Sequence, residues 1–184
     1  QRAAHAAWRA LRRRWPDAGA VTVLAGRGNN AGDGYLVAAL AQRAGWQVRV
    51  LAVGDVQALQ GDAALALAEA QACGVSIEAW HAEAPLHGVL VDALLGTGIA
   101  GAVREPYAGA IATINASGLP VLAIDLSSGL CADTGRVLGQ AVRADLSVTF
   151  IGLKLGLFTA EGPDRVGTLV FDDLQADPGI VAQV

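Results

Sequence analysis

Three polar side chains in a glycine-rich bend are the first residues of the sequence that could do chemistry. The bend, residues 26–34, carries Asn29, Asn30 and Asp33 and directly follows the apolar run 21–25. An apolar strand, a glycine-rich bend and a helix N-terminus together make a phosphate-binding arrangement. Binding a phosphate requires neither two adjacent amides nor a carboxylate, so these side chains predict a further function for the bend.

Two more carboxylates come directly after apolar runs. Asp92 follows the run 89–91, and Asp125 follows the run 121–124. A carboxylate at the end of a buried strand is costly unless it is paired, coordinated or hydrogen-bonded. Both aspartates are therefore candidates for acid–base chemistry or for holding a cation, in one crevice with the bend.

Two loops near these carboxylates add groups that could contact a ligand. Residues 96–101 contain three glycines, which let backbone amides approach a ligand closely. Ser127, Ser128 and Gly129 follow Asp125 and supply two hydroxyl groups and a flexible point.

Predicted strands and helices alternate along the chain, and they must position these residues. Hydrophobic periodicity and turn signals predict helices over residues 1–15, 33–44, 56–72 and 106–116. They predict strands over residues 21–25, 46–53, 75–80, 88–95, 120–126, 146–152 and 166–172, the last at an edge. This order predicts an α/β fold, a Rossmann-like three-layer αβα sandwich with a mostly parallel sheet. In such a sheet, ligands bind beyond the carboxyl ends of the strands, where the strand order reverses.

Composition narrows the class of protein. The 184 residues suit a single domain, 1–184, with 53% hydrophobic and 16% charged residues. A net charge of −4 predicts no nucleic-acid or membrane partner, and no apolar run approaches the roughly 18 residues of a spanning helix. Cys73 and Cys131 form no CxxC motif, which favours a reducing cytoplasm. The absence of methionine leads us to expect a piece of a longer chain.

A dinucleotide-binding oxidoreductase is the first alternative. Gly26, Gly28 and Ala31 fit the Gly-x-Gly-x-x-Gly/Ala pattern. That pattern expects an acidic residue at the end of the second strand to hold the ribose. Here the acid is displaced, because Asp55 comes only after Gly54.

A metal enzyme and a serine hydrolase are two further alternatives. The three histidines lie in the first helix and in the turn 81–87, away from the crevice, so zinc is disfavoured. Amide, carboxylate and hydroxyl oxygens suit a hard cation, and potassium is plausible with so few carboxylates. The Ser127–Ser128 pair is not a Gly-x-Ser-x-Gly nucleophile and has no histidine base, so hydrolysis is rejected.

Four segments together resemble one family. Residues 23–34, 91–98, 124–130 and 149–154 are similar to the signature motifs of the NAD(P)H-hydrate epimerase family, the YjeF N-terminal domain. The resemblance implies an isomerase that interconverts the R and S forms of hydrated NAD(P)H, NADHX and NADPHX, at C6 of the nicotinamide ring. It also implies a homodimer or larger homo-oligomer, fused in bacteria to a dehydratase domain.

The resemblance also implies site residues. Asp125 would contact the substrate near its reactive ring, and one potassium ion per subunit would bind Asn30, Asp92 and Ser128. From the chemistry of a hydroxyl group beside a ring nitrogen, we expect Asp125 to be the catalytic acid/base. Substrate contacts would come from Asn29, Asn30, Ala31, Gly32, Asp33, Gly96, Thr97, Gly98, Ile99, Ala100, Gly101, Ala102 and Asp125. The chain departs from the family pattern where Ala31 replaces Gly and where Ser127 and Leu155 replace Pro.

A binding module is the rival class. The same fold could serve as a nucleotide-binding or protein-interaction module without epimerase activity. Asp33, Asp92, Asp125 and Ser128 are all present, which favours the enzyme.

Overall fold

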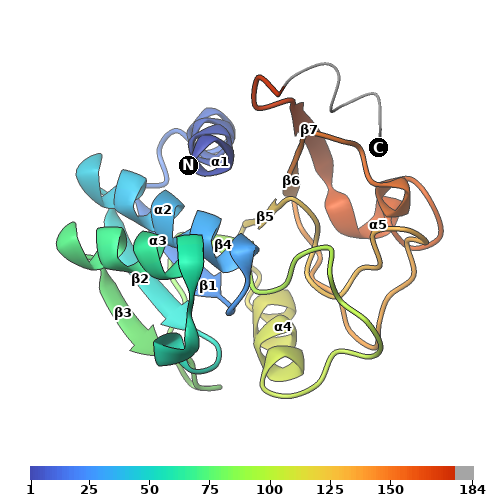
Figure 1. The fold of residues 1–184 in the computed structure, drawn as a ribbon, viewed down its shortest axis with the longest axis horizontal. Coiled ribbons are helices and arrows are strands. Elements are labelled where there is room, and N and C mark those ends of the chain that lie inside the picture. Colours follow the sequence, from blue (N-terminus) through green and yellow to red (C-terminus); the bar gives the residue numbers. More distant parts are fainter. Residues whose placement is uncertain (177–184) are drawn as a thin grey trace.

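A single parallel sheet organises residues 1–176, the part of the chain that the computed structural model describes. Its seven strands lie in the order β3-β2-β1-β4-β5-β6-β7, and every neighbouring pair is parallel (Figure 1). The strands are β1 (Ala20–Ala25), β2 (Gln47–Ala52), β3 (Ser76–Ala79), β4 (Val89–Ala93), β5 (Val121–Ile124), β6 (Leu146–Phe150) and β7 (Thr168–Asp172). The predicted α/β fold and the edge position of the last strand are confirmed.

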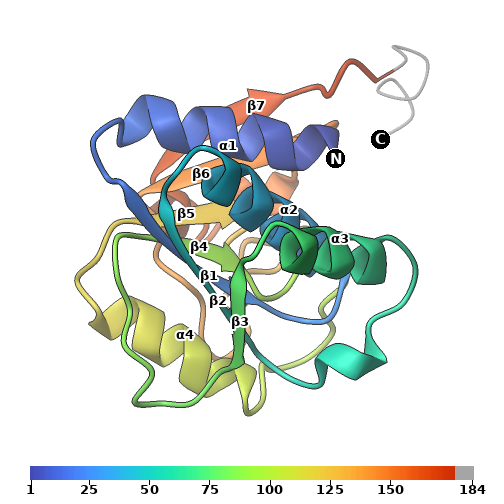
Figure 2. The same ribbon diagram turned by 90° about the vertical axis from the view of Figure 1, so that its left-hand side faces the viewer.

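Helices cover both faces of the sheet. The helices are α1 (Arg2–Arg14), α2 (Asn29–Arg43), α3 (Gly61–Ala72), α4 (Tyr107–Ala116) and the short α5 (Pro163–Val166). Figure 2 shows α1, α2 and α3 on one side of the sheet and α4 on the other. The larger apolar core lies under α1, α2 and α3, and a second core lies between the sheet and α4. These are the three layers that the sequence predicts.

Two predicted helices have different bounds in the structure. The helix expected over 33–44 begins at Asn29, so the polar bend forms its first turn rather than a preceding loop. The helix expected over 56–72 is two elements, the 3-10 turn η1 (Val56–Ala58) and α3. Leu59 and Gln60 between them are extended, which interrupts the helical hydrogen bonding. A second 3-10 turn, η2 (Leu155–Leu157), and α5 were not predicted.

Two tryptophans near the N-terminus pack into the larger apolar core. Trp8 on α1 is buried, and its ring meets Trp46 edge to face with centroids 5.0 Å apart. Trp15 is partly buried against the same core.

Within residues 1–176 no helix is both long and apolar enough to cross a membrane. The extent of the domain, predicted as 1–184, stays a prediction, and residues 177–184 lie outside the described part.

Candidate nucleotide-binding cleft

A large cleft lies at the carboxyl ends of the strands, where the strand order reverses between β1 and β4. Its volume is about 1090 Å³, at the large end of ligand sites, which usually measure about 300–1,000 Å³. The segments after β1, β4, β5 and β6 all contribute to its walls. Eight predicted substrate residues line it: Asn29, Asn30, Asp33, Gly96, Thr97, Gly98, Ile99 and Asp125.

The bend supplies one wall as the open N-terminus of α2. Gly28 is the N-cap residue, in an extended conformation, and no side chain caps the helix. The first amides of a helix have no partners within the helix, so they are free to bind an anion. Gly28 and Asn29 are exposed and line the cleft, which places this helix end against a bound ligand.

Two glycines of the bend are required by packing. A Cβ on Gly26 would lie 1.9 Å from the carbonyl oxygen of Leu94, and one on Gly34 would lie 2.5 Å from Cβ of Ala93. These contacts hold the bend and the start of α2 directly against the end of β4. Neither glycine has a positive φ, so close approach, and not an unusual backbone conformation, explains them.

Asp33 is a half-buried carboxylate in the cleft wall. No hydrogen bond to its carboxylate is found within residues 1–176. Burial raises the pKa of Asp33, and the negative charge of Asp125 adds to this shift. The folded protein therefore favours the protonated form of Asp33 more than the unfolded chain does.

This shift predicts that Asp33→Asn stabilises the fold at neutral pH. Because the pKa is raised in the folded state, ionising Asp33 costs folding free energy as pH rises above its ordinary value of 3.8. The variant should therefore resist urea better than wild type at pH 7.5, with a smaller difference at pH 4.5. Urea unfolding at both pH values measures this; a difference that grows as the pH falls would contradict it.

Asp125 projects into the cleft from a strained turn after β5. Its φ is 67°, which is uncommon for a residue with a side chain, and Leu126 N–H donates to the Ile124 carbonyl at 2.8 Å. This hydrogen bond across a single residue defines a γ-turn, a rare conformation when φ is positive. Backbone strain of this kind gathers at functional sites, so the turn supports a chemical role for Asp125.

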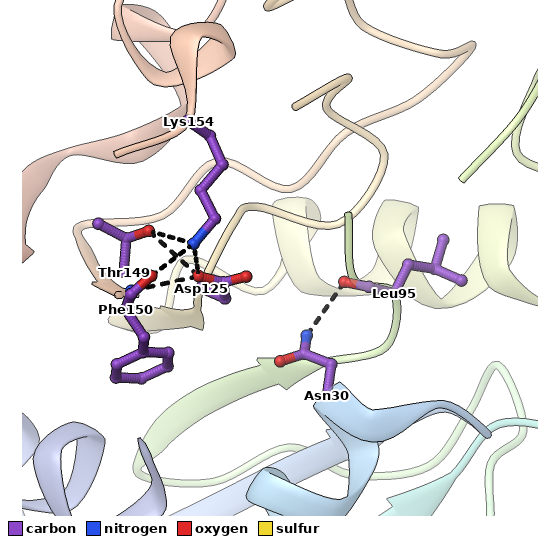
Figure 3. A network of polar contacts seen from close by, with 6 residues as sticks. All are labelled: Asn30, Leu95, Asp125, Thr149, Phe150 and Lys154. Atoms are coloured by element: carbon purple, nitrogen blue, oxygen red, sulfur yellow. Dashed lines mark hydrogen bonds and ion pairs between the residues drawn. The ribbon is translucent and has the colours of Figure 1, made fainter. Parts of the chain in front are cut away.

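The carboxylate of Asp125 is held by three donors (Figure 3). Thr149 Oγ1 donates to Oδ1 at 3.1 Å, the Phe150 backbone N–H donates at 3.3 Å, and Lys154 Nζ forms an ion pair with the same oxygen. Thr149 and Phe150 end β6, the neighbouring strand. Strand β5 therefore fixes the backbone of the predicted catalytic residue, and the end of β6 fixes its carboxylate.

Asp92 lies under the cleft and not in its lining. Its side chain is 0% exposed. Oδ2 accepts the Ser128 N–H at 2.8 Å, and Oδ1 accepts the Ser128 hydroxyl at 2.6 Å and the Leu94 N–H at 3.2 Å. Burial raises the pKa of Asp92 to about 6, although these hydrogen bonds oppose the shift. The expectation that Asp92 shares the crevice with Asp125 is wrong, because β4 turns this side chain toward Ser128.

The donor atoms around Asp92 suit a hard cation. Asn30 Nδ2 donates to the Leu95 carbonyl at 3.0 Å, and the Ser128 hydroxyl lies 3.2 Å from the same oxygen (Figure 3 shows the Asn30 contact). The Ser128 hydroxyl, the Leu95 carbonyl and the Asn30 amide group therefore gather beside a buried carboxylate that has no ion pair within residues 1–176. The same part of the chain contains no cluster of three or more His, Cys, Asp or Glu side chains. The site fits a monovalent ion better than zinc.

Five other predicted substrate residues do not line the cleft: Ala31, Gly32, Ala100, Gly101 and Ala102. Ala31 is fully buried within α2, so its methyl group joins the apolar core and imposes no positive φ. Ser127, another departure from the family pattern, is anchored, since its hydroxyl donates to the Arg165 carbonyl at 2.9 Å. Leu155 is exposed at the cleft.

Two basic residues of the cleft were not predicted as site residues. Lys154 contacts Asp125, and Arg27 lines the cleft without a hydrogen bond or ion pair within residues 1–176. The motif 149–154 contained a signal for Lys154, because it places the lysine two residues beyond the predicted end of the strand 146–152. The position of Arg27 inside the bend gave no comparable signal.

The fold and the cleft define a Rossmann-like protein with a nucleotide-sized site at the topological switch point. Comparison with known protein families identifies the family to which the chain belongs. The family model described as YjeF-related protein N-terminus matches residues 1–156. The chain belongs to this family.

Curated relatives support the same assignment. The chain is 45% identical over 174 residues to the bifunctional NAD(P)H-hydrate repair enzyme Nnr of Coxiella burnetii, covering 94% of this chain and 36% of that protein. It is 42% identical over 183 residues to the Escherichia coli enzyme of the same name, covering 99% and 36%. The chain thus spans about a third of the length of these relatives.

A solved structure shows the same fold. The crystal structure of yeast ynu0, YNL200c, matches with a TM-score of 0.71 over 80% of this chain and 68% of that chain. At 20% identity this likeness establishes the architecture alone.

Proposed function

We propose that this chain is an NAD(P)H-hydrate epimerase, an isomerase that interconverts the R and S forms of NADHX or NADPHX at C6 of the nicotinamide ring. The observation that carries the proposal is Asp125, presented by a strained turn into a nucleotide-sized cleft. Membership of the family and the names of the curated relatives support the choice of substrate. The open N-terminus of α2 offers amides for the diphosphate.

Two carboxylates of the cleft divide the proton transfers in this proposal. C6 carries a hydroxyl next to the ring nitrogen, so protonating that hydroxyl lets water leave as the nitrogen forms an iminium ion. Asp33, which has no ion-pair partner within residues 1–176 and whose pKa is raised by burial, takes the role of proton donor. Asp125, paired with Lys154, stabilises the planar cation and accepts a proton from the returning water; this proton returns to Asp33 through solvent before the next turnover. Water adds to either face, so the two epimers interconvert without a redox change.

A potassium ion beside Asn30, Asp92 and Ser128 is part of the proposal. Bound there, it would supply positive charge to the buried Asp92 carboxylate and order the loops on both sides of the cleft. The ligand residues themselves connect α2, β4 and the segment after β5. An ion at this position would stabilise the site without taking part in bond breaking.

Potassium should therefore raise the thermal stability of the chain more than sodium. At equal ionic strength we expect a Tm higher by a few degrees in KCl, since each kcal/mol of ligand stabilisation adds roughly 2–4 °C for a chain of this size. Asp92→Asn should abolish the difference between the two salts, whereas Asp172→Asn, in a distant ion pair with Arg9, should keep it. Equal Tm values for wild type in both salts would contradict the proposed potassium site.

A second domain and self-association complete the proposal. The curated relatives are about three times as long as this chain, which supports fusion to a second domain, for which we propose a dehydratase. We further propose a homodimer or larger homo-oligomer in the cytoplasm, where Cys73 and Cys131 would stay free thiols, as they are in the structure. Sedimentation velocity of the chain tests the assembly, and a monomer at tens of micromolar would contradict it.

A further inference from the structure

Lys154 is the only lysine of the sequence, among thirteen basic residues. It follows β6 in the cleft wall, and its side chain is 18% exposed. Withdrawing an ammonium group from water is costly unless charges and hydrogen bonds replace the water. Its position therefore requires a compensating contact, which the structure supplies.

The ammonium group of Lys154 has a complete set of acceptors. Nζ donates to Thr149 Oγ1 at 3.0 Å, to the Phe150 carbonyl at 3.0 Å and to Asp125 Oδ1. A lysine ammonium has three N–H donors, so none is left for a substrate. Lys154 thus acts on the chemistry through Asp125 rather than by donating a proton itself.

The two oxygens of Asp125 are unequal as a result. Oδ1 accepts from Lys154, from Thr149 and from the Phe150 N–H, whereas Oδ2 accepts no hydrogen bond within residues 1–176. In Figure 3 the second oxygen points away from Lys154, toward the side where Asn30 and Leu95 lie. The free oxygen is therefore the one that a ligand in the cleft can reach.

We propose that Lys154 is a positioning residue for the epimerisation, which pairs with Oδ1 of Asp125 and so turns its Oδ2 toward the reacting carbon. The inference rests on the proposed function. Asp33 faces the same cleft from α2, so without Lys154 the two carboxylates would stand near each other uncompensated. One of them would then take up a proton at a higher pH than in wild type. Arg27, the other cationic side chain of the cleft, is exposed and makes no ion pair with either.

The backbone supports this placement of Lys154. Ile151 has a φ of 64°, and the Gly152 N–H donates to the Phe150 carbonyl at 2.7 Å, so a second γ-turn follows β6. A β-branched residue at positive φ is strained and persists only when its surroundings impose it. The turn carries the chain from β6 to Lys154. Asp125 thus lies within one strained turn and Lys154 follows another, at the ends of the neighbouring strands β5 and β6.

The test compares Lys154→Met, Lys154→Arg and the control Arg43→Met, which removes a cation from the exposed ion pair with Glu69. We expect Lys154→Met to lower kcat by about 10- to 100-fold with KM changed less than about threefold, a smaller loss than the 10²–10⁴-fold attributed to an acid–base group itself, because Asp125 is still present. The acid limb of its kcat–pH profile should move to higher pH. Lys154→Arg should restore part of kcat, and Arg43→Met should equal wild type. A Lys154→Met enzyme with wild-type kcat and pH profile would overturn the proposal.

A second measurement does not depend on the activity or on the folding of a lysine variant. ¹⁵N-lysine labelling gives a single side-chain ammonium signal, because the chain has one lysine. We expect this signal to be protected from solvent exchange in wild type and lost to exchange in Asp125→Asn. An equally protected signal in both proteins would refute the Lys154–Asp125 pair. Wild type without epimerase activity would instead refute the proposed function and leave this comparison intact.

Discussion

Asp125→Asn should lower the rate of NADHX epimerisation by about 10²–10⁴-fold, the usual contribution of a general acid or base. Asparagine keeps the size of the side chain and tolerates positive φ better than most residues, so the γ-turn at φ 67° should survive. The variant loses the negative charge that faces the iminium ion and the base that accepts the proton. Steady-state kinetics with separated R and S epimers measure the effect.

A matched control excludes a general effect of removing an aspartate. Asp172→Asn removes a carboxylate that pairs with Arg9 at 2.9 Å, outside the cleft lining. This control should keep wild-type kcat and KM. Binding of NADP⁺ to Asp125→Asn, measured by calorimetry, should stay within about threefold of wild type, since the change in rate reflects the transition state. Epimerisation by Asp125→Asn at the wild-type rate would contradict the assignment.

Gly26→Ala should have the largest effect on stability. The added Cβ would lie 1.9 Å from the Leu94 carbonyl oxygen, and the adjacent Gly26 N–H donates to the Ala93 carbonyl at 3.0 Å. Relief requires β1 and β4 to separate at the switch point, so we expect a loss of about 3 kcal/mol or more, above the usual 1–3 kcal/mol of overpacking. Urea unfolding of purified protein, or absence of soluble protein, reports it.

Gly28→Ala is the matched control for that prediction. A Cβ on Gly28 would meet no atom within 4 Å, and its φ of −96° suits alanine. The variant should lose only about 1 kcal/mol or less, since alanine is a poorer N-cap residue than glycine but meets no steric clash here. Equal losses in the two variants would contradict the packing explanation for Gly26.

The sheet could be predicted from the sequence because its strands are short apolar runs that follow turn residues, as residues 121–124 after Gly118 and Pro120 illustrate. Helix starts were less predictable. Asn29 and Asn30 are weak helix formers, yet they begin α2 because its following residues pack on the sheet. Propensity indicates a loop there, and tertiary packing overrides it.

The site was partly predictable for a different reason. Asp92 and Asp125 both follow apolar runs, and the sequence does not distinguish them. The structure does, because Asp92 is still within β4 and faces Ser128, whereas the γ-turn after β5 turns Asp125 into the cleft. The role of Lys154 depends on contacts between the ends of two strands, which spacing along one segment does not reveal.

The central claim, epimerisation at the cleft, is tested most directly by adding the wild-type chain to pure S-NADHX and following both epimers by ¹H NMR. We predict that the R form appears at a rate far above that in buffer until both epimers reach equilibrium, with no net change in their sum. An R-form rate equal to that in buffer, under conditions where the chain binds NADP⁺, would contradict the claim and favour a nucleotide-binding module.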